Sequence, residues 1–269
     1  MKIKTMEYDV LVIGGGGAGY IAAYEACKSG ISVALVTKGH GSTHMAMGAL
    51  AGVGSWHTEG DSKDTHFIDT IKGGCFLNEQ KLVRKIVNEI DKKIIELEKL
   101  GAYWERTRDG KGYRLRIDGG HSYPRSVYFE DRPGQQILKA VGGELAKRNN
   151  VRVFENFIVT KLLSAKESIA GAIAIDMIYG DCTLFKVKSI VLATGGGGQV
   201  YEITSQPVRN TGDGYSLALR VGAEVMDMEF IQFYPIGIIY PEGIKGVTGV
   251  PLYYSHLLNV DGERFMKRY

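Results

Sequence analysis

The feature that most constrains the fold of this chain is an apolar stretch that runs into glycines and then into a helix-like segment. Residues 8–19 read YDVLVIGGGGAG, and a mainly apolar run follows over 20–27. This order predicts a strand, a tight turn at Gly14, Gly16 and Gly19, and the start of a helix. Glycines let the backbone approach phosphates closely, and the free N–H groups that begin a helix attract anions. The pattern therefore predicts a site for the pyrophosphate of a dinucleotide.

The end of the second predicted strand, 31–36, narrows the choice of dinucleotide. A site for NAD carries an acidic residue at this point, about 20 residues after the glycines. The sequence has Thr37, Lys38 and Gly39 there instead. The missing carboxylate argues against NAD(H) and leaves FAD or another phosphorylated nucleotide open. Lys38 either meets a phosphate or is an ordinary solvated lysine.

An ordered series of motifs extends over almost the whole chain. Besides residues 9–19, it comprises segments 33–39, 41–53, 69–74, 119–134, 190–201, 210–235 and 257–269. The series resembles the flavoprotein subunits of succinate dehydrogenase and fumarate reductase, and L-aspartate oxidase of the same superfamily. This resemblance implies an FAD-dependent oxidoreductase that transfers a hydride between the flavin and a dicarboxylate-type substrate, such as succinate or fumarate.

Size and composition exclude several other classes. The chain has 269 residues, 44% of them hydrophobic and 23% charged, and a net charge of +3, which is ordinary for one or two globular domains. Scattered basic residues argue against nucleic-acid binding, and no apolar run approaches the roughly 18 residues of a membrane span. Three cysteines without a CxxC pair fit a reducing cytoplasm and argue against a metal or iron–sulfur site in this chain. We expect a cytoplasmic protein, or one held at the cytoplasmic membrane face through partner subunits.

The expected fold class is α/β: a Rossmann-like FAD-binding domain with an antiparallel β element, plus the start of an α+β capping domain. We place the incomplete FAD-binding domain at 1–234 and the capping domain at 235–269. Helices are predicted at 78–100, capped by Asn78, at 133–147 with Pro133 near its start, and at about 214–222. Meander strands are predicted at 151–154, 157–163, 169–179 and 183–187, a buried parallel strand at 189–193, and an ordered, buried loop at 37–62.

The resemblance also implies which residues contact FAD. They are Gly14, Gly16, Gly17, Ala18, Gly19, Thr37, Lys38, Ser42, Thr43, Met47, Gly48, Ala49, Thr194, Gly195, Gly196 and Asp213. Ser42 stands where membrane-bound members carry a histidine linked to the flavin, and neither His40 nor His44 takes that place. We therefore expect FAD to be bound non-covalently. Asp213 is read as a ribityl or ribose contact, with a simple helix N-cap as the alternative.

The candidate substrate residues are Tyr234, His121, Arg125 and Thr248. Arg125 suits a carboxylate, although pairing with Glu130 or Asp131 at the surface explains it equally well. Tyr234 replaces a histidine that binds the substrate in the family. A tyrosine donates one hydrogen bond but carries no positive charge. Thr248 lies one position from the family's substrate threonine. These departures weaken the dicarboxylate assignment without touching the flavin assignment.

The family's chains continue past Tyr269, and the arginine that transfers the proton lies in that later part, so no catalytic residue is assigned here. We expect either a fragment or a second chain that completes the FAD domain, and little activity from this chain alone. Electrons would pass to an iron–sulfur partner subunit. Two alternatives stay open: a soluble enzyme like L-aspartate oxidase, favoured by GSTHMAMG and GGHS, and an FAD-binding electron-transfer subunit without a dicarboxylate site, favoured by Tyr234 and Val247.

Overall fold

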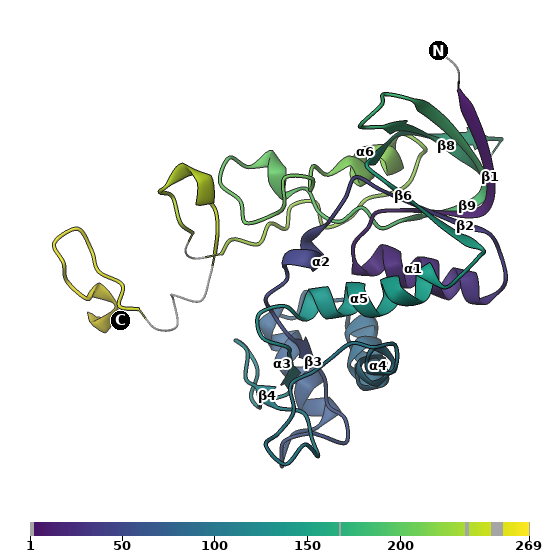
Figure 1. Ribbon diagram of the computed structural model, residues 1–269. Helices are drawn as coiled ribbons and strands as arrows, with labels where there is room; N and C mark the ends of the chain where they lie inside the picture. The colour runs from purple at the N-terminus through teal and green to yellow at the C-terminus, as the bar shows by residue number, and fades with distance from the viewer. Residues whose placement is uncertain (1–2, 167, 235–236, 249–254, 269) are drawn as a thin grey trace. The chain divides into compact units, whose positions relative to one another are not determined.

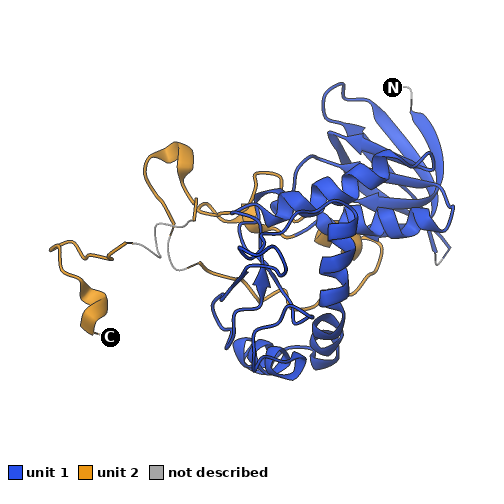
Figure 2. Ribbon diagram, turned by 60° about the horizontal axis from the view of Figure 1, so that its bottom comes forward, with its two compact units in different colours: residues 1–195 blue, residues 196–269 orange. Residues whose placement is uncertain are grey.

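The computed structural model describes residues 3–166, 168–234, 237–248 and 255–268. The chain divides into two compact units, residues 1–195 and 196–269, which Figure 2 shows in blue and orange. Each unit is described by itself below. The predicted domain boundary at 234 stays a prediction, and Pro235, on its far side, lies outside the described residues.

The first unit is built on a six-stranded sheet with the strand order β6-β2-β1-β9-β8-β7. Its first four strands are parallel, and they are β6 (Val151–Glu155), β2 (Val33–Thr37), β1 (Lys4–Ile13) and β9 (Cys182–Leu192). Strands β8 (Ser168–Asp176) and β7 (Phe157–Ala165) add an antiparallel hairpin to β9. The sheet and the helices beside it confirm the α/β fold class with an antiparallel β element.

The centre of the sheet is the core of this unit. All residues of β2 are buried, because β1 and β6 flank this strand. In β1, Val12 lies opposite Leu35 on one side and Val191 on the other, and both Val12 and Leu35 are fully buried. Each buried aliphatic side chain of this size stabilises the fold by about 1.5–3 kcal/mol.

Helices α1 (Gly17–Lys28) and α5 (Pro133–Ala146) lie side by side in Figure 1 and contact one another. Small residues allow this closeness: a side chain at Gly142 would meet the Tyr20 ring at 3.1 Å. Helix α5 starts at Pro133, which confirms the helix predicted there. Proline suits this position because the first N–H groups of a helix have no partner within it.

Helices α3 (Lys63–Gly73) and α4 (Gln80–Lys99) form a second helical pair. The prediction of α4 is confirmed, but its cap is Glu79 rather than Asn78, since the Glu79 carboxylate accepts a hydrogen bond from the Lys81 N–H. Helix α3 was not predicted. Its signal is the Ser62 side chain, which accepts from the Thr65 N–H as an N-cap.

Three strand predictions need correction. The segments 183–187 and 189–193 form one continuous strand, β9. Its last part is not buried as predicted: Val191 and Leu192 are 37% and 38% exposed, because β8 pairs with β9 only as far as Lys186. Strand β6 does not belong to the antiparallel meander but pairs in parallel with β2, since the chain between them crosses over through α5.

The segment 37–62 is ordered, as predicted, by the short helix α2 (Ser42–Met45) and by β3 (Leu50–Ala51). Strand β3 joins β5 (Ser126–Val127) and β4 (Leu115–Arg116) in a small antiparallel sheet. The segment is not buried throughout, because residues 45–48 are exposed.

The second unit contains α6 (Asp213–Leu219) and the short 3-10 helices η1 (Gly198–Val200), η2 (Glu242–Ile244) and η3 (Phe265–Arg268). Helix α6 confirms the predicted helix near 214, although it ends earlier. Large apolar side chains such as Phe233 and Met226 are exposed. Within the described parts of both units, no helix combines the length and the apolar character that crossing a membrane requires.

Candidate functional site

Only glycine fits at Gly14, in the turn between β1 and α1, and at Gly19, in the first turn of α1. Gly14 has φ +122°, and a Cβ there would lie 2.1 Å from the Ala193 carbonyl oxygen at the end of β9. A Cβ at Gly19 would lie 1.8 Å from the Gly14 carbonyl oxygen. Both contacts are far below the van der Waals limit. The backbone therefore forms a tight cradle beside the start of α1, into which a phosphate can come close.

The start of α1 carries no side-chain cap of its own, because its N-cap residue is Gly16. Instead, Thr43 of α2 accepts a hydrogen bond of 2.9 Å from the Gly17 N–H through its Oγ1. The backbone of Gly134 in the first turn of α5 lies against the same residue, since a Cβ there would be 1.8 Å from the Thr43 carbonyl oxygen. Thr43 thus links the starts of two helices, whose positive dipole ends favour an anion.

The predicted adenosine contacts, Thr37 and Lys38, lie at the end of β2. Thr37 is buried, and its hydroxyl donates to the Gly39 carbonyl oxygen at 2.8 Å and accepts from the Gly39 N–H at 3.0 Å. A Cβ at Gly15 would lie 2.4 Å from the Thr37 Oγ1. Thr37 therefore shapes the turn against the glycine cradle. Lys38 follows it at the same edge, and its contact with the cofactor stays a prediction.

The predicted flavin segment begins at α2. Ser42 is its first residue, whereas Met47 and Gly48 are exposed and Ala49 is half-buried. The rings of His40 and His44 stack on one another with centroids 4.5 Å apart. The contacts of Ser42, Met47, Gly48 and Ala49 with the flavin stay predictions.

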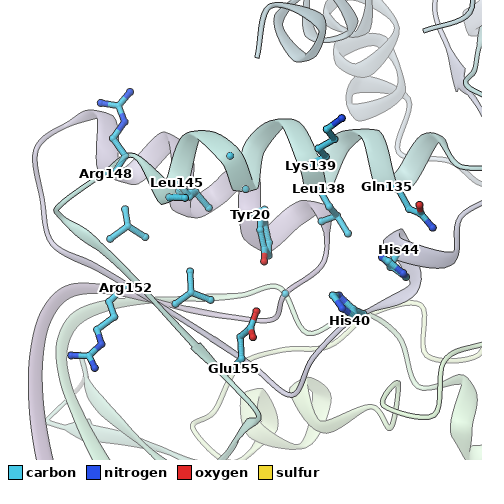
Figure 3. A pocket seen from close by; sticks show the side chains of 16 residues that line it. Tyr20, His40, His44, Gln135, Leu138, Lys139, Leu145, Arg148, Arg152 and Glu155 are labelled. Atoms are coloured by element: carbon cyan, nitrogen blue, oxygen red, sulfur yellow. The ribbon is translucent and has the colours of Figure 1, made fainter. Parts of the chain in front are cut away.

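A pocket of about 650 Å³ opens beside the glycine cradle, between α1, α5 and β6 (Figure 3). Apolar side chains of α5 and β6 line one part of it, and they are Leu138, Leu145, Val151 and Val153. Tyr20 and Glu155 point toward one another across the pocket. Burial, together with the Glu155 carboxylate, raises the pKa of Tyr20, so this hydroxyl keeps its proton at neutral pH.

A buried ionic cluster surrounds Arg125, which is fully inaccessible to solvent. Its Nε and Nη2 atoms donate to both oxygens of Asp61 at 2.9 and 2.7 Å, and its Nη1 donates to Asp69 at 2.8 Å. The Nη1 atom also lies 3.1 Å from Nδ1 of His121. The predicted alternative partners at the surface, Glu130 and Asp131, are wrong: the carboxylates come from segments 56 and 64 residues away.

The cluster shifts the titration of its neighbours. Burial raises the pKa of Asp69, but hydrogen bonds from Ser122 and Arg125 outweigh this effect and hold the pKa below its usual value. Burial, reinforced by Arg125 and His121, lowers the pKa of His66 to about 4. The guanidinium group is therefore neutralised by carboxylates of the chain itself, and the role of His121 and Arg125 toward a substrate stays a prediction.

The remaining predicted residues lie beyond β9. Thr194 and Gly195 follow this strand, and Gly196 begins the second unit. The N-cap alternative for Asp213 is wrong, because Gly212 with φ +76° is the N-cap of α6 and Asp213 is its first helical residue. The Asp213 carboxylate accepts from the Thr211 hydroxyl at 2.7 Å.

The two substrate candidates of the second unit differ in exposure. Tyr234 is 48% exposed and Thr248 is half-buried. Sequence reasoning missed Tyr20, Asp61, Asp69 and Glu155 as part of a candidate site. Only Glu155 had a signal in the sequence, since it directly follows the strand predicted at 151–154.

The sequence matches the family model of an FAD binding domain over residues 9–269. It is 36% identical over 276 residues to a fumarate reductase (CoM/CoB) subunit of Methanothermobacter marburgensis, covering 100% of this chain and 50% of that protein. It is 34% identical to the succinate dehydrogenase flavoprotein subunit of Coxiella burnetii, covering 100% of this chain and 47% of that protein.

Among solved structures, the Mycobacterium smegmatis Sdh1 complex in its apo form superposes with a TM-score of 0.92 at 35% identity, over 98% of this chain and 47% of that chain. A quinol-fumarate reductase with menaquinol superposes with a TM-score of 0.90 at 29% identity, over 99% and 46%. The chain spans about half the length of the curated relatives it matches. It belongs to the FAD-binding-domain family that includes the flavoprotein subunits of fumarate reductases and succinate dehydrogenases.

Proposed function

We propose that this chain is the FAD-binding part of an oxidoreductase that transfers a hydride between flavin and a dicarboxylate-type substrate, such as succinate or fumarate. The observation that carries the proposal is the glycine cradle at the start of α1, in a chain whose family model is an FAD binding domain. Relatives named fumarate reductase and succinate dehydrogenase support the choice of substrate class.

The cradle fits the pyrophosphate of FAD. Gly14 and Gly19 leave room for a close approach, and the first N–H groups of α1 have no partner within the helix. The positive end of the α1 dipole offsets part of the diphosphate charge. The start of α5, which lies against Thr43, adds a second positive helix end. Once bound, the flavin supplies the hydride chemistry, and the protein supplies orientation and electrostatics.

We propose non-covalent binding, because a serine hydroxyl at Ser42 replaces the histidine that forms the link in membrane-bound relatives. His40 and His44 stack on each other, which occupies one face of each ring. The expected partners are an iron–sulfur subunit that accepts or delivers electrons and, if the FAD domain is shared between chains, a second chain that completes it. The cytoplasm, or the cytoplasmic face of a membrane reached through those subunits, is the location that we propose.

An absorption spectrum of the purified protein, taken before and after acid precipitation, tests the proposal. Oxidised-flavin bands that move to the supernatant support non-covalent FAD, whereas bands that stay with the pellet contradict it. Absence of flavin bands, together with no spectral change on addition of FAD, contradicts the function as a whole. Succinate- or fumarate-dependent reduction and reoxidation of the bound flavin then tests the substrate class.

A second candidate is an FAD-binding electron-transfer subunit without a dicarboxylate site of its own. The ionic cluster favours it, because Asp61 and Asp69 already occupy the guanidinium of Arg125 that a substrate carboxylate would need. Bound flavin that is reduced and reoxidised but ignores every dicarboxylate identifies this function. Peroxide production that depends on aspartate would instead identify an enzyme like L-aspartate oxidase.

A further inference from the structure

The usual partner of a dinucleotide ribose is absent from its usual place in this chain. In Rossmann-like sites, an acidic residue at the end of the second strand binds the ribose hydroxyls. Here β2 ends at Thr37, whose hydroxyl donates a hydrogen bond to the Gly39 carbonyl oxygen and accepts one from the Gly39 N–H. The next residue, Lys38, carries a positive charge and accepts no hydrogen bond. The sugar of an adenosine bound at this edge therefore needs another acceptor.

The neighbouring strand supplies a carboxylate at the same level. Strand β6 pairs in parallel with β2, and its last residue, Glu155, lies in register with Thr37. Adjacent strands are about 4.8 Å apart, and parallel strands end at the same edge of the sheet. Glu155 thus stands one strand away from the usual position of the acid, at the edge that carries the glycine cradle.

The Glu155 carboxyl points into the pocket that opens beside this cradle (Figure 3). Gly15 and His40 line the same pocket, so it reaches the turn where the pyrophosphate is expected. In Figure 3 the guanidinium groups of Arg148 and Arg152 point away from Glu155. Within the described part of the chain, Glu155 has neither a hydrogen bond nor an ion pair, and its acceptor oxygens stay available.

The surroundings of Glu155 suit a sugar that carries a base. Tyr20 faces it, and its protonated hydroxyl supplies a donor at the same place. Leu138 and Leu145 of α5 offer an apolar wall of the kind that a heteroaromatic ring prefers. A carboxylate beside a donor matches two adjacent hydroxyl groups, because each hydroxyl both donates and accepts.

We propose that Glu155 binds the ribose hydroxyls of the adenosine half of FAD, in place of an acidic residue at the end of β2. Glu155 acts as a positioning residue for the cofactor, since it binds the part remote from the flavin. The inference rests on the proposed binding of FAD. The ribose-binding acid is thereby placed on β6, the strand beside β2. The sequence pattern around the glycine motif does not reveal this position.

Competition between two nucleotides tests this role. The full-length protein is purified together with any partner chains, and bound FAD is removed. Rebinding of FAD is then measured by titration, with flavin fluorescence as the signal. ADP and 2′,3′-dideoxy-ADP, which lacks both hydroxyls, then compete with FAD. A hydrogen bond to a charged group contributes about 1.5–3 kcal/mol, so we expect ADP to bind about tenfold more tightly or better.

The decisive variant is Glu155→Ala, with Glu89→Ala on the exposed face of α4 as the matched control. We expect Glu155→Ala to bind ADP about tenfold more weakly, to bind dideoxy-ADP unchanged, and so to lose the preference. The control keeps the preference. A preference that survives in Glu155→Ala, or is absent from the unsubstituted protein although FAD binds, overturns the inference alone. Failure of FAD itself to bind overturns the proposed function and this inference with it.

Discussion

The buried imidazole of His66 makes the stability of this fold depend on pH in a defined interval. The side chain is 5% exposed, and its Nδ1 has no hydrogen-bond partner within the described structure. Its pKa lies at about 4 in the folded protein, against 6.5 for an ordinary histidine. Between these two values, the unfolded chain binds more protons than the folded one, so stability falls as the pH decreases.

The size of this effect follows from the shift. One pKa unit corresponds to 1.36 kcal/mol, so the shift of His66 amounts to about 3 kcal/mol between pH 6.5 and about 4. Other groups titrate as well, but the lowered pKa of Asp69 places its contribution at more acidic pH: this stabilisation is present above the unfolded value of 3.8 and is lost below it. The pH dependence of stability above about pH 4 therefore reports on His66 with little contribution from Asp69.

Urea denaturation at pH 7 and at about pH 4.5 measures the effect, with His66→Gln as the comparison. We expect the unsubstituted protein to lose about 2–3 kcal/mol more than the variant over this interval. The slopes against urea concentration are expected to agree between the two proteins. Equal losses in both would refute the reasoning, because they would show that His66 is not kept neutral by its burial beside Arg125.

Three further substitutions test the cradle and the ionic cluster. Gly19→Ala places a methyl group 1.8 Å from a carbonyl oxygen and is expected to abolish FAD binding in a fluorescence titration, whereas Gly143→Ala in α5 meets nothing within 4 Å and keeps it. Thr43→Val removes the acceptor of the Gly17 N–H and is expected to cost about 1 kcal/mol of unfolding free energy, which Thr43→Ser restores. Arg125→Met leaves two buried carboxylates without their partner and is expected to cost about 3–5 kcal/mol by urea denaturation; a loss below 1 kcal/mol would contradict the buried pairing.

Local patterns made the first βαβ unit predictable. An apolar strand, three spaced glycines and a helix start follow one another within residues 8–27, and each of them is decided by neighbours in sequence. The same holds for α5, where Pro133 marks the first turn. The strand β9 was predicted as two strands because the charged Lys188 interrupts its apolar pattern, as Lys186 does before it. Both lysines stay within the strand and extend to Glu7 and Asp9 of β1.

Contacts between distant segments decided what the sequence did not reveal. The parallel pairing of β6 depends on a crossover of more than a hundred residues, and the pattern of 151–154 is equally typical of a hairpin strand. The partners of Arg125 come from the segments before and within α3, which no spacing relates to it. Glu155 belongs to the candidate site only because the register brings it beside Thr37.

The half-paired strand β9 has a practical consequence for handling this chain. Beyond Lys186 its outer edge has no strand beside it in the described parts of the chain, and Val191 and Leu192 of this stretch are partly exposed. An open, apolar edge presents a row of backbone donors and acceptors that acts as a template for strands of other molecules. Concentrated preparations of the isolated 269-residue chain will tend to self-associate through β9, and a chain segment that adds a strand at this edge will suppress it.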